Sequence, residues 1–549
     1  MNKQNLLKGT AILTVAGLLT RLLGFFYRIY LSNALGAERL GIYQLIFPLY
    51  GICFTIYASG LQTAISQLTA AQSAKEQDGH PGRILAAGLS VSLLCSLTLS
   101  AIVWSKHTFI AEHLLLEPEC AQSLRILAYV FPFCGITACI NGYFYGLKNA
   151  SVPAATQFLE QVVRIVSVYA MAVFIGGGNM SVTVEIAVAG VVLGEIASNL
   201  YNLAWLARDV KKRKKEEQNR TYHPSSAPLT DKYRNSPPSG TSTPDGRPSS
   251  TDSLEKYCNP SVSSSQTYKK LLGLSVPLTL NRLLINMLHS FEAVLIPGML
   301  RRFGLSSSEA LSVYGILNGM AMPFLLFPGT ITNSLSVLLL PAISEAQAAD
   351  NRASIKNATG LSIRYSLIIG IFSTGIFLVF GRQLGITVFG NETAGDYLTI
   401  MAWLCPMLYT ATTLGSIING LGKAHITFLN SVIGQSLRLA LLYLLIPRLG
   451  ITGYFAGTMI SQIIITALDF GYVVKLTDYS FDWIKSLIKP TIAAFVSCAL
   501  FVKLYEALCG RVSLPRLILM AVCCLGMGLL YLGMLVFGKV LSKEELNSR

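Results

Sequence analysis

Long apolar runs separated by short polar stretches recur along the whole chain. About 20 apolar residues in a helix cross a ~30 Å hydrocarbon layer. Fourteen such runs predict an all-α polytopic membrane protein, because a helix satisfies its own backbone in lipid. Their approximate ranges are 10–32, 41–70, 84–104, 125–147, 153–176, 182–206, 271–299, 310–338, 361–380, 397–420, 425–447, 452–474, 486–506 and 515–537.

One polar segment interrupts this pattern. Residues 208–270 open with a basic run and are then rich in Ser, Thr and Pro. Such a segment buries too little apolar surface to offset its chain entropy, so we expect a disordered cytoplasmic linker. It separates an N-terminal six-helix lobe, 1–207, from a C-terminal six-helix lobe, 271–475. Residues 476–549 add two further spans and a cytoplasmic tail.

The two predicted lobes carry a weak internal repeat. Shifts of 274 and 261 residues align polar positions inside apolar spans. Six spans in each half give both halves one orientation, which predicts a pseudo-twofold axis along the membrane normal and a central cavity. The aligned polar pairs are Gln161 with Gln435, Arg164 with Arg438, Arg21 with Arg282, and Arg28 with His289.

Composition and charge exclude a soluble globular protein. Hydrophobic residues make up 52% of the chain, charged residues 13%, and the mean hydropathy is +0.53. The net charge is +15, and the basic residues are concentrated in every second loop. By the positive-inside rule we expect both termini in the cytoplasm, and this placement explains the charge without a nucleic-acid partner. The first apolar run lacks a cleavage pattern and is predicted to remain as a helix. Most cysteines lie in apolar spans and none forms a CxxC pair, so we expect apolar packing residues rather than a metal site or a disulfide framework. We also expect no cofactor.

Two arginines inside the first apolar run are the leading candidate site. An arginine near the bilayer centre costs roughly 2.5 to 3.5 kcal/mol on insertion scales, so it usually faces a polar interior. Arg21 and Arg28 share a helix face, and Arg282 with His289 repeats the spacing. Guanidinium groups suit phosphate, so the two pairs are predicted to bind a pyrophosphate across the cavity. Interfacial snorkelling or pairing with a carboxylate is the alternative for Arg21 and Arg28.

Further ionisable residues lie within the predicted spans. The i,i+4 spacing of Glu160 and Arg164 predicts an intrahelical ion pair. Arg164 and Arg438, which the repeat aligns, are additional candidates for substrate binding. Glu195 and Asp469 are candidates for carrying a coupling proton or cation, or for pairing with buried arginines.

Motifs near the N-terminus carry a family resemblance. The motifs are Lys8-Gly9-Thr10, Thr20-Arg21-Leu22-Leu23-Gly24-Phe25-Phe26-Tyr27-Arg28, Leu35-Gly36-Ala37-Glu38, Gly41-Ile42-Tyr43-Gln44 and Ala64-Ile65-Ser66. They resemble the stage V sporulation protein B group of the multidrug/oligosaccharidyl-lipid/polysaccharide (MOP) exporter superfamily, which also contains the lipid II flippase MurJ. The resemblance implies a flippase, not an enzyme, that moves an undecaprenyl-pyrophosphate-linked oligosaccharide, a peptidoglycan or spore-cortex precursor, across the bacterial cytoplasmic membrane by alternating access.

The resemblance also separates the two arginines. Arg21, followed by Leu23-Gly24-Phe25, matches a substrate-cavity arginine of the MurJ pattern, whereas Arg28 departs from it. The expected partners are the lipid-linked substrate and membrane lipids, with a monovalent cation or proton and cell-wall synthesis proteins as further candidates. A cation-coupled multidrug antiporter, for which carboxylates are expected in the opening helices, and a non-transporting scaffold for cell-wall synthesis remain alternatives.

Overall fold

Helices make up most of the part of the chain that the structure describes. The computed structural model describes residues 3–74, 81–175, 181–221, 264–509, 511 and 515–540, and it contains no strand within them. Twelve of the described helical runs are long and apolar enough to cross a membrane, or thirteen with the bent pair formed by Cys120–Leu127 and Val130–Gly146. The predicted all-α polytopic class is therefore confirmed, and the total of fourteen spans stays a prediction.

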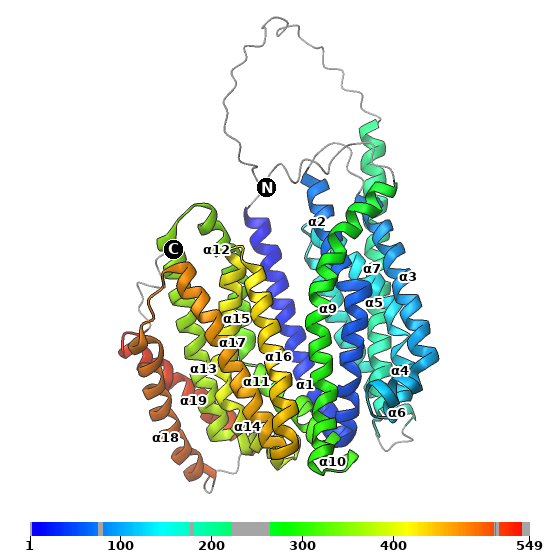
Figure 1. Cartoon of the computed structure of the whole chain (residues 1–549). Coiled ribbons are helices and arrows are strands. Elements are labelled where there is room, and N and C mark those ends of the chain that lie inside the picture. Colours follow the sequence, from blue (N-terminus) through cyan, green and yellow to red (C-terminus); the bar gives the residue numbers. More distant parts are fainter. Residues whose placement is uncertain are drawn as a thin grey trace, which may run out of the picture.

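The first helical run contains a reversal. Leu19–Gln72 is 54 residues long, far more than one crossing needs, and it is interrupted at Gly36. Gly36 has φ 75° and ψ 171°, a backbone conformation that glycine adopts without a Cβ clash. In Figure 1 the dark-blue chain descends from the end marked N and a lighter blue chain rises again to α2. This one run covers the first predicted range, 10–32, from residue 19 onward, and all of the second, 41–70.

The N-terminal half folds into one group of helices. Two of its spans contain a π-helical turn: η1 joins α1 to α2, and η2 extends the end of α3. Its elements are α1 (Lys3–Phe54), η1 (Thr55–Ser59), α2 (Gly60–Ala74), α3 (Pro81–Phe109), η2 (Ile110–Leu114), α4 (Cys120–Leu127), α5 (Val130–Gly146), α6 (Ser151–Ile175) and α7 (Val184–Thr221).

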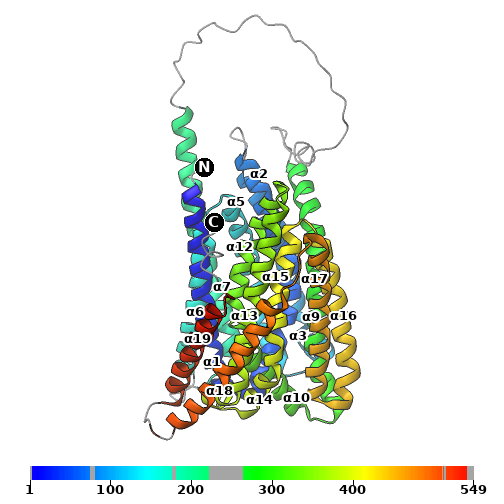
Figure 2. The same cartoon turned by 90° about the vertical axis from the view of Figure 1, so that its left-hand side faces the viewer.

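The C-terminal half forms a second group, with two added helices. Figures 1 and 2 show the second group beside the first, and α18 and α19 pack against α13 on its outside. Its elements are α9 (Ser264–Phe303), α10 (Ser307–Gly315), η3 (Ile316–Ala321), α11 (Met322–Leu326), α12 (Gly329–Ala348), α13 (Arg352–Phe389), α14 (Glu392–Met401), η4 (Ala402–Leu404), α15 (Cys405–Gly420), α16 (Ala424–Leu449) and α17 (Ile451–Thr477). The added elements are η5 (Ile484–Ile488), α18 (Lys489–Cys509) and α19 (Arg516–Phe537).

Helices pack in matching pairs within the two groups. In the first group α6 packs against α1 and α7, and α5 packs against α2 and α7. In the second group α16 packs against α9 and α17, and α15 packs against α12 and α17. Each group is thus built around the same neighbour relations, and the pseudo-twofold axis itself stays a prediction.

Both ends of the predicted linker are helical. Helix α7 continues through the basic run to Thr221, and α9 already begins at Ser264. Lys, Arg, Glu and Gln have good helix propensity, and Arg213 Nε lies 2.8 Å from Asp209 Oδ2 as an i,i+4 pair. The disorder predicted for 208–270 is therefore wrong at both margins, and residues 222–263 lie outside the described part of the chain.

The two groups meet closely at the end that holds α10, opposite the start of α1 (Figure 1). Gly41 of α1 and Gly315 of α10 permit this approach. A Cβ on Gly41 would lie 2.1 Å from the carbonyl oxygen of Leu311, and one on Gly315 would lie 2.0 Å from that of Ala37. No larger residue fits at either position without moving the backbone, so the closure depends on glycine at both.

An ion pair reinforces the closure at the same end. Arg301, in the last turn of α9, places Nη2 2.7 Å from Oε2 of Glu117 in the first group. Its Nη1 donates to the Leu116 carbonyl at 2.8 Å, and the Ser307 hydroxyl donates to the same Glu117 carboxylate at 3.0 Å. Because Glu117 is only 5% exposed, this contact between the two groups is well shielded from solvent.

Candidate functional site

Helix α1 contacts both groups of helices on two adjacent faces. Gly24 faces its own group, where a Cβ would lie 3.8 Å from Nε2 of Gln161 on α6. Phe25 faces the second group, and its ring centroid lies 4.6 Å from those of Phe324 and Phe327. The face of α1 between these two contacts is therefore directed at the space between α6 and α11.

Arg21 and Arg28 occupy that face. At about 100° per residue, both point between the directions of Gly24 and Phe25. Both side chains are exposed, and neither has a hydrogen bond or ion pair with any other described residue. Two guanidinium groups without a carboxylate thus face the region where the two groups of helices meet.

Arg282 on α9 contacts the opposite helix group directly. Its Nη1 donates to both the carbonyl oxygen and the hydroxyl oxygen of Ser59, each at 2.7 Å. Ser59 ends the π-helical turn η1 of the first group. Arg282 is exposed and pairs with no carboxylate among the described residues, so its charge is solvated only by neutral groups.

Two further residues on the same face of α9 extend this contact. Asn286 donates to Oγ1 of Thr55 at 2.5 Å, and the Ser290 hydroxyl donates to the Pro48 carbonyl at 3.0 Å. Arg282, Asn286 and Ser290 are four residues apart, so they form one row along the helix. We call this row and its partners the α9 seam, and it joins α9 to the second span of the opposite group.

His289 lies at the edge of the α9 seam. Helical spacing directs it between Asn286 and Glu292. Its side chain is 56% exposed, and Nδ1 is 3.9 Å from Oε2 of Glu292. Like Arg28, its partner in the repeat, His289 faces the space between the two groups.

The other two predicted arginines are neutralised inside the helix groups. Arg164 forms the ion pair with Glu160 that their i,i+4 spacing predicts. Arg438 Nε on α16 lies 3.0 Å from Oε1 of Glu292 on α9, and Gln435 also donates to this carboxylate. The aligned arginines therefore each have a glutamate, one on the same helix and one on a neighbouring helix.

Sequence reasoning missed Glu292 as the partner of Arg438. The available signal was a carboxylate in an apolar span, only three residues from His289. Pairing it with Arg438, however, requires knowing that α9 packs against α16, which a single sequence does not reveal.

The two candidate coupling carboxylates are buried at aligned positions. Glu195 on α7 is 6% exposed, and its Oε2 lacks a hydrogen-bond partner in the described structure. Asp469 on α17, 274 residues later, is 5% exposed and accepts a hydrogen bond from Asn430 Nδ2 at 2.8 Å. Neither forms an ion pair with an arginine within the described ranges.

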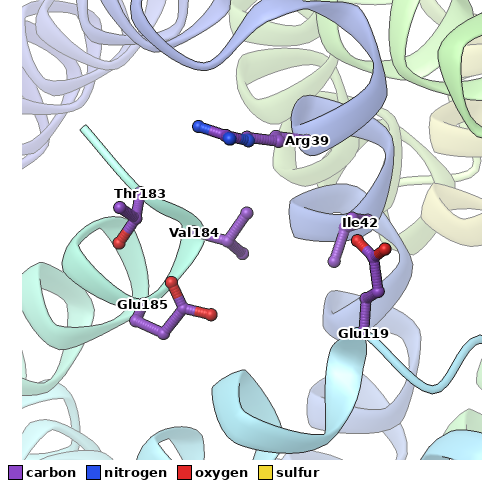
Figure 3. A pocket seen from close by; sticks show the side chains of 6 residues that line it. All are labelled: Arg39, Ile42, Glu119, Thr183, Val184 and Glu185. Carbon is purple, nitrogen blue, oxygen red and sulfur yellow. The ribbon is translucent and has the colours of Figure 1, made fainter. Parts of the chain in front are cut away.

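A separate hollow of about 220 Å³ lies at the N-terminal group (Figure 3). It combines one arginine with two glutamates, so an anion there would meet carboxylates as well as a guanidinium. It contains none of the predicted site residues and is distinct from the cationic face of α1. Its lining residues are Arg39, Ile42, Glu119, Thr183, Val184 and Glu185.

The sequence of the chain is similar to those of known proteins. Residues 6–229 match a family described as polysaccharide biosynthesis protein. The stage V sporulation protein B of Bacillus subtilis (strain 168) is 28% identical over 507 residues, which cover 91% of this chain and 90% of that protein. The resemblance found in the N-terminal motifs is therefore confirmed over most of the length.

Solved structures show the same fold. The lipid II flippase MurJ in an inward closed conformation superposes with a TM-score of 0.65 at 14% identity, covering 95% of this chain and 98% of that one. An inward-facing multidrug resistance MATE family transporter of the MOP superfamily gives a TM-score of 0.61 at 15% identity, covering 84% and 94%. The helices described above thus have the fold of MOP superfamily transporters.

Proposed function

We propose that this relative of stage V sporulation protein B, with the fold of the MOP superfamily, is a flippase for a polyprenyl-pyrophosphate-linked oligosaccharide. The single observation that carries the proposal is the set of arginines without carboxylates, Arg21, Arg28 and Arg282, beside the space between the two helix groups. A family described by polysaccharide biosynthesis and a structural relative named as a lipid II flippase support the same substrate class.

The chemistry of a pyrophosphate fits these arginines. Charge-assisted hydrogen bonds from guanidinium to phosphate are roughly twice as strong as neutral ones, and the planar fork binds two oxygens at once. Arg21 and Arg28 approach from α1, and Arg282 and His289 approach from α9. In this proposal Arg164 and Arg438 lie within the helix groups next to the site. Their ion pairs with glutamates offset their charge and hold α6 and α16 in position.

The closed α10 end supports alternating access. With both termini in the cytoplasm, the Arg301–Glu117 pair and the Gly41–Gly315 approach close the extracytoplasmic side of the cytoplasmic membrane. The described conformation is then the one that accepts substrate from inside. When the two groups rock about the bound head group, the extracytoplasmic side opens. The substrate is then released to the outer leaflet.

We assign the coupling role to Glu195 in preference to Asp469. A buried carboxylate with an unpartnered oxygen is costly unless it takes up a proton or a cation, whereas Asp469 already accepts from Asn430. Glu195→Gln removes the charge at nearly constant shape, so transport driven by an ion gradient is expected to disappear while substrate binding remains.

The experiment uses purified protein in liposomes loaded with lipid II as the probe, and measures the fraction of probe exposed in the outer leaflet. Arg21→Ala and Arg282→Ala are each expected to lower the rate at least tenfold. Arg125→Ala is the matched control, because Arg125 lies over the Trp104 ring and away from the site. Full activity of both site variants would refute the assignment.

A further inference from the structure

The hydrogen bonds of Arg282 hold a π-helical turn. Helix η1 is a π-helical turn of five residues, Thr55–Ser59, and Arg282 caps its last residue from the opposite helix group. Single π-helical turns inside α-helices are rare and occur frequently at functional sites. The neighbouring Gly60 packs so tightly that a Cβ would lie 2.0 Å from Oγ1 of Thr279 on α9. The seam and the turn therefore behave as one unit.

The second group has a π-helical turn at the aligned position. Helix η3 starts at Ile316, which is 261 residues after Thr55, the first residue of η1. It meets α1 through an apolar contact, since a Cβ on Gly319 would lie 2.3 Å from Cδ2 of Leu40. Of the two turns, η1 is thus the one tied by an arginine, and this arginine belongs to the candidate site.

Arg282 is able to exchange its partners. Both present acceptors are neutral oxygens of Ser59, and a phosphate oxygen forms a stronger, charge-assisted bond. The guanidinium is exposed, and it lies on the same edge of α9 as His289, which faces the space between the groups. A substrate head group in that space therefore reaches Arg282 without displacing any buried side chain.

We propose that Ser59 is a positioning residue that holds Arg282 in the resting state and gives it up to the pyrophosphate of the substrate. The exchange unties η1 from α9, so that binding itself loosens the seam along which the two groups must rock. This inference rests on the proposed function, because it needs Arg282 to bind the pyrophosphate. It adds that Ser59 and the substrate compete for the same guanidinium.

The competition is tested by binding of undecaprenyl pyrophosphate to the full-length protein in nanodiscs. Ser59→Ala removes one of the two resting acceptors, so the Kd is expected to fall three- to tenfold. Ser59→Thr keeps the hydroxyl and is expected to bind as the unchanged protein does. In an Arg282→Ala background, Ser59→Ala is expected to have no effect. Ser100→Ala is the control, since it removes a serine hydroxyl that bonds the Ala128 carbonyl within one group.

The outcomes separate this inference from the proposed function. If the unchanged protein fails to bind the probe, or Arg282→Ala binds as tightly as it does, the proposed site fails and the competition fails with it. If Arg282→Ala weakens binding but Ser59→Ala does not tighten it, or tightens it equally in both backgrounds, the competition alone is overturned.

A second measurement needs no change at Ser59. Amide hydrogen exchange over residues 55–63 is expected to rise when undecaprenyl pyrophosphate is added to the unchanged protein, because the turn loses its cap. The rise is expected to be absent in Arg282→Ala. Equal exchange with and without the probe, in protein shown to bind it, contradicts the release of η1.

Discussion

At the scale of single residues, the five candidate arginines in the described membrane helices fall into two classes. Arg164 and Arg438 have glutamate partners and are largely buried, whereas Arg21, Arg28 and Arg282 have none. An uncompensated charge inside a membrane span is expensive, and this cost supports the binding role proposed for the second class, whereas the first class is neutralised by its ion pairs. The division follows from the partners and not from residue type, since all five are arginine.

The arginines with glutamate partners give a prediction for the stability of the protein. Breaking a buried ion pair by removing one partner costs about 3 to 5 kcal/mol, because the remaining charge is buried alone. Arg438 and Glu292 are 14% and 11% exposed, so Glu292→Ala is expected to lower the melting temperature strongly. Changing both Glu292 and Arg438 to Gln is expected to recover most of the loss.

An exposed ion pair provides the control for this experiment. Arg382 and Glu392 are 61% and 55% exposed, and exposed pairs contribute about 0 to 1 kcal/mol. Glu392→Ala is therefore expected to leave the melting temperature nearly unchanged. Equal losses for Glu392→Ala and Glu292→Ala would contradict the division between the two classes.

Sequence periodicity predicts which face a residue occupies, but not which helix that face meets. The shared face of Arg21 and Arg28 follows from their spacing, and the structure shows both side chains without a partner. Glu292 and Arg438 are far apart in sequence, and their contact arises only when α9 packs against α16. The hydrogen bonds from Arg282 to Ser59 likewise depend on how the two groups pack.

At the scale of elements, hydropathy finds the membrane spans and misses their bends. The predicted range 125–147 is split into α4 and α5 with a bend of 43°. The range 310–338 contains η3, α11 and parts of α10 and α12, with Pro323 and Pro328 at the breaks. An average over about 20 residues contains no information on backbone direction, so the turns η1 and η3 were not predicted either.

The contact between α9 and the η2–α4 connection gives a prediction at this scale. Glu117→Arg places two like charges at the closed α10 end, where Glu117 is 5% exposed. The variant is expected to flip the lipid II probe at least fivefold more slowly, because the closed state is destabilised. Combining it with Arg301→Glu restores an opposite pair, and the rate is expected to recover in part.

The recovery distinguishes an ion pair from general disruption. Arg302→Glu is the matched control for the second change, because Arg302 lies over the Tyr443 ring and not against Glu117. It is expected to give no recovery when combined with Glu117→Arg. A normal rate for Glu117→Arg alone would show that this contact does not limit the transport cycle.

At the scale of the whole molecule, the two groups are joined by two unlike surfaces. Helix α1 meets the second group through Phe25 and through the close approach at Gly41, both without charge. Helix α9 meets the first group through the polar α9 seam and the Arg301–Glu117 pair. The repeat predicts equivalent lobes, whereas these two surfaces differ in polarity. Under the proposed function, the α9 side is the one that a charged substrate loosens.

Replacing the segment between the two groups tests whether the protein is a transporter or a scaffold. Helix α7 ends at Thr221 and α9 begins at Ser264, and the candidate site lies wholly within the helices. A flippase therefore needs residues 222–263 only as a connection. Replacing them with a Gly/Ser linker of equal length is expected to keep the flipping rate within about twofold, since such linkers span distance without fixing it. A scaffold that recruits cell-wall enzymes through this segment is expected to lose its function when the segment is replaced. The same scaffold is expected to keep its function in Arg21→Ala. Measuring flipping in liposomes and complementation in cells for both variants separates the two functions, and loss of flipping on linker replacement would contradict the transporter.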